Sequence, residues 1–329
     1  MPRKMPSWWN EEIGWRPIAL SPLAAIYGAA VKARFARAKP YKARIPVICV
    51  GNFTMGGAGK TPLAIALAML LIARGERPAF LTRGYGGREG GPVWVDLVAH
   101  GAVDVGDEPL LLARHAPVMV ARARPEGARA IEQTDASVII MDDGFQNSSL
   151  HKDLSIVAVD GGFGIGNGRV FPAGPLRAPL DFQMPRADAI VTIGGTAQKL
   201  VSAGCRLHLT ATLQPVGAEW LRDARVFGFC GIGRPEKFFE TLSRCGAEIA
   251  RTESFSDHYV YDETDASRLV ASARRLNAQL VTTEKDFVRL PAYSDGAIAE
   301  LRREVRALAV ELTFTREDED KLLSLLSSV

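Results

Sequence analysis

The sequence predicts an α/β protein built on a doubly wound, mostly parallel sheet. A short apolar strand at 45–50 leads into a glycine-dense loop that ends in Lys60-Thr61. A helical run over 63–71 follows at once. Apolar strand segments and helical segments then alternate along most of the chain, which is typical of parallel α/β folds.

Composition supports a folded, two-domain protein. The chain has 329 residues, of which 47% are hydrophobic and 23% are charged, so it is globular and long enough for two domains. The net charge of +3 is too small to indicate a nucleic-acid partner. The cysteines are scattered without a C-x-x-C pair, which predicts reduced thiols and no structural zinc. They are Cys49, Cys205, Cys230 and Cys245.

The first forty residues differ from the rest. They hold three of the five tryptophans, an apolar stretch over 17–31 and a basic cluster over 32–39. This combination predicts a helical segment in a membrane interface, although a helix packed on the protein is the plain alternative. Phe35 and Ala36 continue the apolar face past the first basic residues, which favours lying on the bilayer over crossing it. We find no evident signal peptide.

The next predicted unit spans 41–217. Its expected helices are 62–73, 110–115 and 125–134. Its expected strands are 45–50, 78–82, 93–95 at an edge, 118–120, 137–141, 156–160 and 189–192.

A smaller α/β unit is predicted over 218–329, and we expect it to close over the active site of the first unit. Its expected helices are 235–245, 263–275 and 316–327. Its expected strands are 226–230, 247–250, 279–283 and 305–312. With the N-terminal segment 1–40, this divides the chain into three parts.

The glycine-dense loop predicts a P-loop NTPase. Its glycines let backbone N–H groups approach phosphate oxygens, Lys60 adds a point charge, and the Thr61 hydroxyl is suited to Mg²⁺. The strict G-x-x-x-x-G-K-[ST] pattern is not met, because Thr54 stands where the first glycine belongs. The predicted nucleotide-binding residues are Thr54, Met55, Gly56, Gly57, Ala58, Gly59, Lys60 and Thr61.

Polar residues follow several predicted strands, where ligands collect in open α/β sheets. Asp142-Asp143 ends an apolar strand, which predicts a Mg²⁺ site, though solvated turn residues are the alternative. Arg83 precedes a glycine turn that suits an anionic group, or is a surface residue. Asp107 stands at a helix start and could be an N-cap. His258 is a plausible proton carrier or a structural histidine.

Together these stretches resemble the tetraacyldisaccharide 4′-kinase family. The matching motifs run in the family's order from about residue 46 to 290. They are Gly51-Asn52, Gly56 to Pro62, Arg83 to Gly86, Gly106 to Pro109, Asp142 to Gln146, Pro172 to Arg177, Asp257-His258 and Thr282 to Asp286. Any one motif is weak, but the ordered series is specific.

The resemblance implies a reaction and a set of roles. The family transfers the γ-phosphate of ATP, with Mg²⁺, to the 4′-hydroxyl of a tetraacyldisaccharide 1-phosphate glycolipid. The reaction takes place at the cytoplasmic face of the inner membrane. No nucleic acid and no obligatory protein partner is expected. The implied roles are phosphate binding by Lys60, metal binding by Thr61, Asp142 and Asp143, a base in Asp107 supported by His258, and charge handling by Arg177 and Arg124. Arg83 and Gln146 are the further expected substrate residues.

Two departures and two alternatives remain. The family usually has Glu after Pro-Leu-Arg, where this chain has Ala178, and tends to have His where it has Asn147. Ala178 removes an acidic group that would support Mg²⁺ binding.

A membrane-associated switch ATPase of the MinD or partition type shares the glycines but carries a signature lysine where Met55 stands. A nucleotide-dependent scaffold without turnover is the other alternative.

Overall fold

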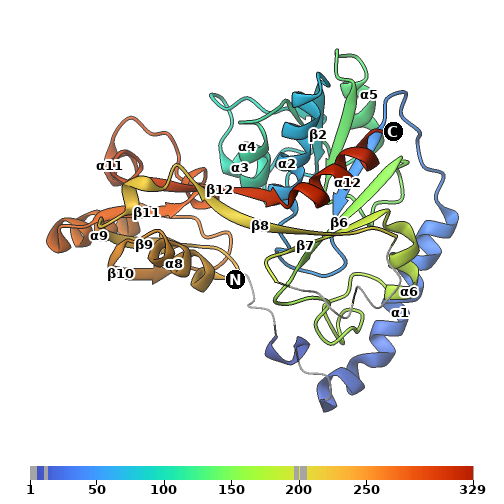
Figure 1. The fold of residues 1–329 in the computed structure, drawn as a ribbon, viewed down its shortest axis with the longest axis horizontal. Coiled ribbons are helices and arrows are strands. Elements are labelled where there is room, and N and C mark those ends of the chain that lie inside the picture. Colours follow the sequence, from blue (N-terminus) through green and yellow to red (C-terminus); the bar gives the residue numbers. More distant parts are fainter. Residues whose placement is uncertain (1–5, 11–13, 196–199, 201–205, 329) are drawn as a thin grey trace.

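The chain forms a single twelve-stranded sheet with helices on both faces (Figure 1). The structure is a computed structural model that describes residues 6–10, 14–195, 200 and 206–328. Strands follow the order β10-β9-β11-β12-β8-β7-β6-β1-β5-β2-β4-β3. The predicted fold class, a mostly parallel doubly wound sheet, is confirmed.

Residues 47–193 make one end of this sheet, which we call the core half. Its strands pair in parallel apart from the short edge strand β3, which is antiparallel to β4. The strands are β1 (Val47–Gly51), β2 (Pro78–Thr82), β3 (Val93–Trp94), β4 (Val118–Val120), β5 (Val138–Asp142), β6 (Leu154–Asp160) and β7 (Ala189–Ile193). The helices are α2 (Lys60–Ala73), α3 (Ala102–Val105), α4 (Asp107–Leu112), α5 (Arg124–Ile131) and α6 (Leu180–Gln183).

Residues 225–304 form the other end, the distal half. Its strands are β9 (Arg225–Cys230), β10 (Glu248–Ser254) and β11 (Gln279–Thr283). Its helices are α8 (Pro235–Arg244), α9 (Glu263–Leu276), α10 (Glu284–Phe287) and α11 (Gly296–Glu304). The three strands run parallel to one another and to β12 (Arg306–Phe314). The final helix, α12 (Arg316–Leu326), returns to the core half, where Leu322 and Leu326 pack in its apolar cluster.

A two-stranded ribbon joins the halves and decides which way they face. β8 (His208–Val216) is parallel to β7, but β12 is antiparallel to β8. The start of β12 pairs with β11, and its end, Phe314, pairs with Ala211 of β8. The strands of the distal half therefore point toward the core half. The carboxyl ends of the two sets of strands face each other across the ribbon.

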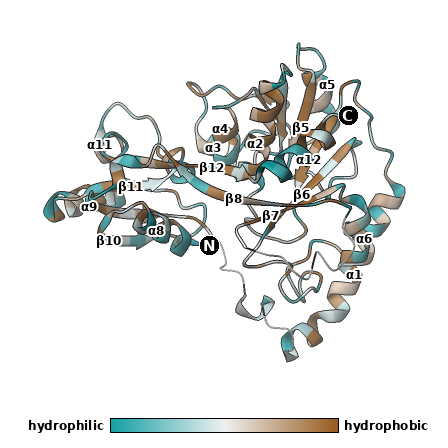
Figure 2. Cartoon of the chain, in the orientation of Figure 1, coloured by the Kyte–Doolittle hydropathy of each residue, from teal (hydrophilic) through white to brown (hydrophobic). Residues whose placement is uncertain are grey.

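Apolar packing explains the central strands. All five residues of β1 are buried, as expected for a parallel strand covered on both faces. One apolar cluster joins α2 and α12 to one face of the core sheet, and a second includes α5 on the other face. The distal half has clusters of its own. Figure 2 shows α2 and β5 among the most hydrophobic elements.

Strand β8 and the short helices α3, α6 and α10 were not predicted from the sequence. β8 reads His-Leu-Thr-Ala-Thr-Leu-Gln-Pro-Val, and its side chains alternate between partly buried and exposed positions along much of its length. Strands buried on both faces carry continuous apolar runs, and this half-exposed ribbon strand has no such run to reveal it in the sequence. Helix α11 was also not predicted. The proposed division at 40 and 217 stays a prediction, and Cys205 lies outside the described residues.

Helix α1 (Trp15–Arg37) lies on the outside of the core half, beside α6 (Figure 1). It buries one narrow side, where Gly28 approaches Pro179 closely. Its large apolar side chains instead face outward: Trp15, Ile18, Leu23 and Ile26. By length and composition alone, this helix of 23 residues could also cross a membrane.

Close packing behind β1 gives a first prediction. A Cβ on Gly51 would lie 2.3 Å from Cβ of Phe145, so Gly51→Ala must displace a buried aromatic residue. We expect it to lower the free energy of unfolding by about 1–3 kcal/mol, measured by urea denaturation. Gly90→Ala is the matched control, because nothing lies within 4 Å of its added Cβ. Equal stability of the two variants would show that this contact is not rigid.

Candidate active site

The glycine-dense loop spans the turn between β1 and α2. Asn52 Nδ2 donates to the carbonyl of Gly56 at 3.1 Å, which closes the loop from inside. The backbone N–H of Met55 donates to the carbonyl of Pro175 at 2.8 Å. Gly59 has φ 82°, and a Cβ there would lie 2.5 Å from Ile193 Cδ1, so only glycine fits. The loop is therefore held in shape by its neighbours.

Lys60 and Arg177 converge on one carboxylate, that of Asp143. Lys60 Nζ lies 3.8 Å from Asp143 Oδ1. Arg177 donates to both oxygens of Asp143, at 3.0 and 3.4 Å, and its Nε donates to the carbonyl of Thr54 at 3.0 Å. Burial alone would raise the pKa of Asp143, but the charges of Lys60 and Arg177 hold it below its usual value. Arg177 thus joins the loop to the end of β5.

Asp142 is a fully buried carboxylate without a partner. Neither of its oxygens accepts a hydrogen bond from any described residue. Burial is the main reason that its pKa rises to about 7, and the nearby Glu108 adds to the effect. Arg124 is also buried; its Nη1 donates to the carbonyl of Ala121 at 2.6 Å, while its Nε has no partner among the described residues. Buried polar atoms without a hydrogen-bond partner among the described residues therefore gather at this end of β5.

These carboxylates fit a magnesium ion. Mg²⁺ takes oxygen ligands and is bound by one or two carboxylates together with substrate phosphates. Asp142 and Asp143 supply such carboxylates beside the loop, and Thr61, in the first turn of α2, is only partly buried. The described residues contain no group of three or more His, Cys, Asp or Glu side chains that could hold a metal ion.

Asp107 is buried at the first position of α4, where it contacts the distal half. His258 Nδ1 lies 3.0 Å from its Oδ2 and must carry the proton, since an ionised carboxylate only accepts. Arg289 places Nε 2.8 Å and Nη2 2.6 Å from the same oxygen. Lys285 Nζ is 4.0 Å away. Among the described residues, the other oxygen, Oδ1, accepts only the backbone N–H of Glu108, at 3.0 Å.

The charges around Asp107 outweigh its burial. Burial alone would raise the pKa of Asp107. The hydrogen bond from His258 and the charges of Lys285 and Arg289 instead hold it well below its usual value. The carboxylate is therefore ionised at neutral pH, with one oxygen saturated and the other partly free.

Sequence reasoning missed Arg289. The structure fixes it from several sides: Nη1 donates to the carbonyl of Gly231 at 2.6 Å and to Asp286 Oδ1 at 2.9 Å. Asp286 in turn accepts from Tyr261 and from the backbone of Gly231. The motif ending at Asp286 was noted without a role, and Arg289 lies one helical turn beyond it. Its partner is 182 residues away in the chain, so no local pattern could reveal the pair.

Other predicted residues have varied surroundings. Gln146 Nε2 donates to the carbonyl of Asn52 at 2.8 Å and to Gln183, so its amide supports the loop. Asn147 Oδ1 accepts from the backbone of Ser149 and Leu150, which holds a turn. Ala178 is buried. In contrast, Arg83 is exposed and makes no hydrogen bond or ion pair with the part of the chain that the structure describes.

A second ion-pair cluster connects the halves. Asp160 ends β6 and lies 3.0 Å from Arg234 Nη1 and 2.9 Å from Lys237 Nζ, both at the start of α8. The cluster and the Asp107 contacts both lie where the facing strands end. The halves thus meet through charges at two places beside the loop.

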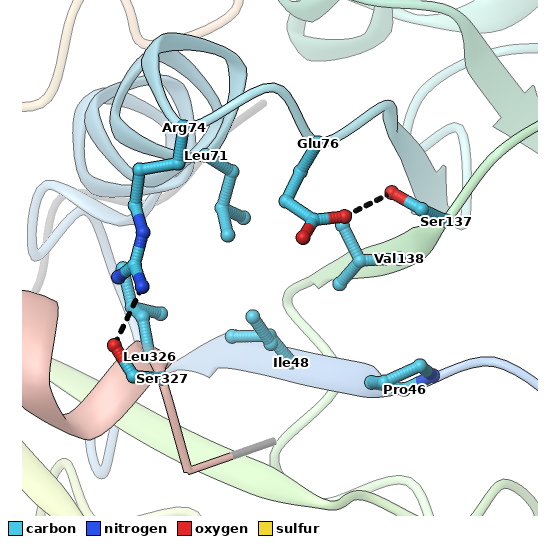
Figure 3. A pocket seen from close by; sticks show the side chains of 9 residues that line it. All are labelled: Pro46, Ile48, Leu71, Arg74, Glu76, Ser137, Val138, Leu326 and Ser327. Atoms are coloured by element: carbon cyan, nitrogen blue, oxygen red, sulfur yellow. Dashed lines mark hydrogen bonds between the residues drawn. The ribbon is translucent and has the colours of Figure 1, made fainter.

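A hollow lies at the edge of the sheet opposite the glycine-dense loop (Figure 3). It measures about 280 Å³ and lies at the amino ends of β1 and β5. Figure 3 shows Arg74 bonded to Ser327 and Glu76 bonded to Ser137, so the polar groups are already paired. We interpret it as a packing gap under the end of α12.

Comparisons with known proteins agree on one family. The family model described as tetraacyldisaccharide-1-P 4′-kinase, LpxK, matches residues 16–328. The tetraacyldisaccharide 4′-kinase of Paramagnetospirillum magneticum is 51% identical over 94% of this chain and 94% of its own length. That of Methylobacterium nodulans is 50% identical over 98% and 95%. The crystal structure of LpxK from Aquifex aeolicus in complex with ATP superposes with a TM-score of 0.72, at 28% identity, over 95% of this chain and 98% of that one.

The buried Asp107–Arg289 pair gives a second prediction. Arg289→Gln removes the arginine that the buried carboxylates of Asp107 and Asp286 share, so we expect it to reduce the free energy of unfolding by about 3–5 kcal/mol at pH 7. The loss shrinks as pH falls below about 4. In the wild type, the stability supplied by the depressed pKa of Asp107 is present above the unfolded value and lost below it. In the variant, Asp107 takes up a proton more readily.

The control is Arg303→Gln, since Arg303 is exposed at the end of α11. Urea unfolding of both variants at pH 7 and at about pH 3 provides the comparison. A loss for Arg289→Gln that is no larger than for the control, or that does not depend on pH, contradicts the assignment.

Proposed function

The chain belongs to the tetraacyldisaccharide-1-P 4′-kinase family, and from this membership we propose how its residues carry out the reaction. It is an ATP-dependent kinase of lipid A biosynthesis. It transfers the γ-phosphate of ATP to the 4′-hydroxyl of a tetraacylated glucosamine disaccharide 1-phosphate. The relatives that match over nearly the whole chain are kinases, so the switch-ATPase and scaffold alternatives have no support among them.

The loop between β1 and α2 binds the phosphates of ATP. Its backbone N–H groups and the N-terminus of α2 favour negative charge, and buried Lys60 stands at that N-terminus. Asp142, Asp143 and Thr61 would hold Mg²⁺, which neutralises charge on the phosphates when it is bound. The unpartnered oxygens of Asp142 support this role, because a buried carboxylate without hydrogen bonds is otherwise unfavourable.

Asp107 receives the acceptor hydroxyl, and its bonding pattern is the observation that carries the proposal. Oδ2 is saturated by His258 and Arg289, whereas Oδ1 accepts a single backbone N–H and has a free lone pair. The 4′-hydroxyl donates its hydrogen bond to Oδ1 and passes its proton there as its oxygen bonds to the γ-phosphorus and the bond from that phosphorus to the bridging oxygen of ATP breaks, which releases ADP. A low pKa suits this role, because a loose phosphoryl-transfer transition state needs orientation of the hydroxyl more than a strong base.

Arginines manage the remaining charge. Arg177 fixes the position of Asp143 and so supports the phosphate site. Arg124 is buried, which lowers its pKa to about 10, and the nearby charge of Asp142 offsets part of that effect. Exposed Arg83, which has no carboxylate partner among the described residues, is free to meet an anionic group of the substrate. Gln146 contributes by supporting the loop.

The membrane location follows from α1. Its four large exposed apolar side chains enter the cytoplasmic side of the inner membrane, and the basic residues at its C-terminal end meet anionic headgroups. The substrate carries four acyl chains, so the enzyme must work at the bilayer surface. The facing strand ends then present Asp107 and the loop to a sugar whose chains stay in the lipid.

One assay tests the function directly. Purified protein is incubated with Mg-ATP and the tetraacyldisaccharide 1-phosphate in detergent, and the lipid is analysed by ³¹P NMR. We expect a second phosphate monoester signal at the 4′ position, formed in step with ADP. ADP without phosphorylated lipid would favour the switch ATPase, and neither product would favour the scaffold. Repeating the assay over a range of Mg²⁺ concentrations shows whether Ala178 weakens metal binding.

A further inference from the structure

A second hollow, of about 320 Å³, lies under the C-terminal end of α1. It is lined by Phe35 of α1, by residues 145–152 after β5 and by residues 185–188 before β7. Ser155, near the amino end of β6, also lines it. The glycine-dense loop follows the carboxyl end of β1, whereas Ser155 shows that the hollow reaches toward the amino ends of the strands. Nothing in the reaction described above uses it.

Two cations, Lys152 and Arg186, line this hollow, and Arg34 lies near enough to Lys152 for its charge to act on it. Lys152 Nζ donates to the carbonyls of Phe145 and Asn147 at 2.9 and 2.5 Å. Arg186 Nη1 donates to the carbonyl of Phe182 at 2.6 Å, and Arg34 Nη2 to that of Gln146 at 2.8 Å.

These cations repel one another. Burial is the main reason that the pKa of Lys152 is lowered, and the charges of Arg186 and Arg34 lower it further. Asp188 also lines the hollow, but its oxygens accept from the backbone of Ser155 and pair with Arg206. Within the described part of the chain, no carboxylate forms an ion pair with Arg34, Lys152 or Arg186. The group therefore lacks an anion.

Aromatic rings hold the cations in place. The Arg186 guanidinium lies 3.7 Å from the ring centre of Phe182, and Phe182 packs edge-on against Phe35 with centroids 5.3 Å apart. Lys152 Nζ is 5.6 Å from the centre of the Phe35 ring. The hollow thus combines fixed positive charge with an apolar wall. This combination suits a ligand that is anionic at one end and apolar beside it.

The position of the hollow indicates where such a ligand comes from. The same helix that ends at the hollow exposes Trp15, Ile18, Leu23 and Ile26 along its length. Lys32 and Arg37 are exposed near its end. If the apolar face of α1 is in the bilayer, its C-terminal end lies at the level of the lipid phosphates.

We propose that Arg34, Lys152 and Arg186 bind the phosphate of an anionic phospholipid headgroup, at a lipid site separate from the acceptor site. Each cation still has N–H groups that do not donate to these carbonyls. A phosphate could accept hydrogen bonds from them and supply the missing negative charge. The proposal rests on the attachment of α1 to the membrane and is independent of the kinase chemistry. The site orients the enzyme on the bilayer surface.

Vesicle binding of two matched variants tests the site. Arg186→Gln and Arg37→Gln each remove one positive charge at the end of α1, but only Arg186 lines the hollow. With vesicles of phosphatidylglycerol and phosphatidylcholine, we expect Arg186→Gln to weaken sedimentation at least tenfold. Arg37→Gln should lose about fivefold or less, the effect of one general surface charge. Equal losses in both variants overturn the proposal.

Soluble ligands separate a lipid site from a phosphate site. Dihexanoyl phosphatidylglycerol, kept below its micelle concentration, should bind the wild type and Arg37→Gln saturably in calorimetry, and Arg186→Gln at least tenfold more weakly. No binding to the wild type overturns the proposal. Glycerol phosphate has the same anion without chains. If it binds as tightly as the short-chain lipid, the site is a free-phosphate site and the lipid assignment is wrong.

Two further readouts distinguish this failure from a failure of the proposed function. Replacing Ile18, Leu23 and Ile26 by Asn should abolish vesicle binding and leave binding of the short-chain lipid intact. Turnover of detergent-dispersed substrate, without phospholipid, should be unchanged in Arg186→Gln, which also shows that the variant is folded. A raised KM for the substrate in that assay would mean that its own 1-phosphate occupies the hollow, and would overturn the separate site.

Discussion

The carboxylate of Asp107 is the point on which the arrangement of the site depends. It belongs to the core half, yet three of its neighbours, His258, Lys285 and Arg289, come from the distal half. A buried charge is strongly unfavourable unless it is paired, so the two halves meet in the one register that compensates it. The same contacts leave Oδ1 partly free. One interaction therefore joins the halves and leaves free the oxygen that we propose as the acceptor of the hydroxyl proton.

The reversal of the sheet at β8 and β12 makes that meeting possible. In an ordinary doubly wound sheet, all carboxyl ends lie along one edge and the ligand is open to solvent on the other side. Here β12 runs antiparallel to β8, so the distal strands end opposite the core strands. The loop, the aspartates after β5 and the groups around Asp107 then surround a space between two sets of strand ends. Closing such a space excludes water from ATP, which limits wasteful hydrolysis.

Much of the core half could be predicted from the sequence, because its chemistry is local. A strand, a glycine loop, Lys60 and a helix follow one another, and Asp142 comes directly after an apolar strand. Asp107 and His258 stood out in the sequence only as candidates with structural alternatives, and their roles as a base and its support came from the resemblance to a family. Arg289 was missed because its meaning depends on a partner 182 residues away. β8 was missed because a ribbon strand with half-exposed residues lacks the apolar run of a buried one.

The role of Asp107 as the proton acceptor is tested most directly by the rate of phosphoryl transfer in a single turnover of Asp107→Ala, with ATP bound and saturating glycolipid. Nucleotide affinity is measured separately, because the phosphate loop does not depend on Asp107. We predict that the rate falls by roughly two orders of magnitude or more while the Kd for ATP changes little, as expected for a lost proton acceptor. An unchanged rate, or an equal loss explained by weaker ATP binding, would contradict it.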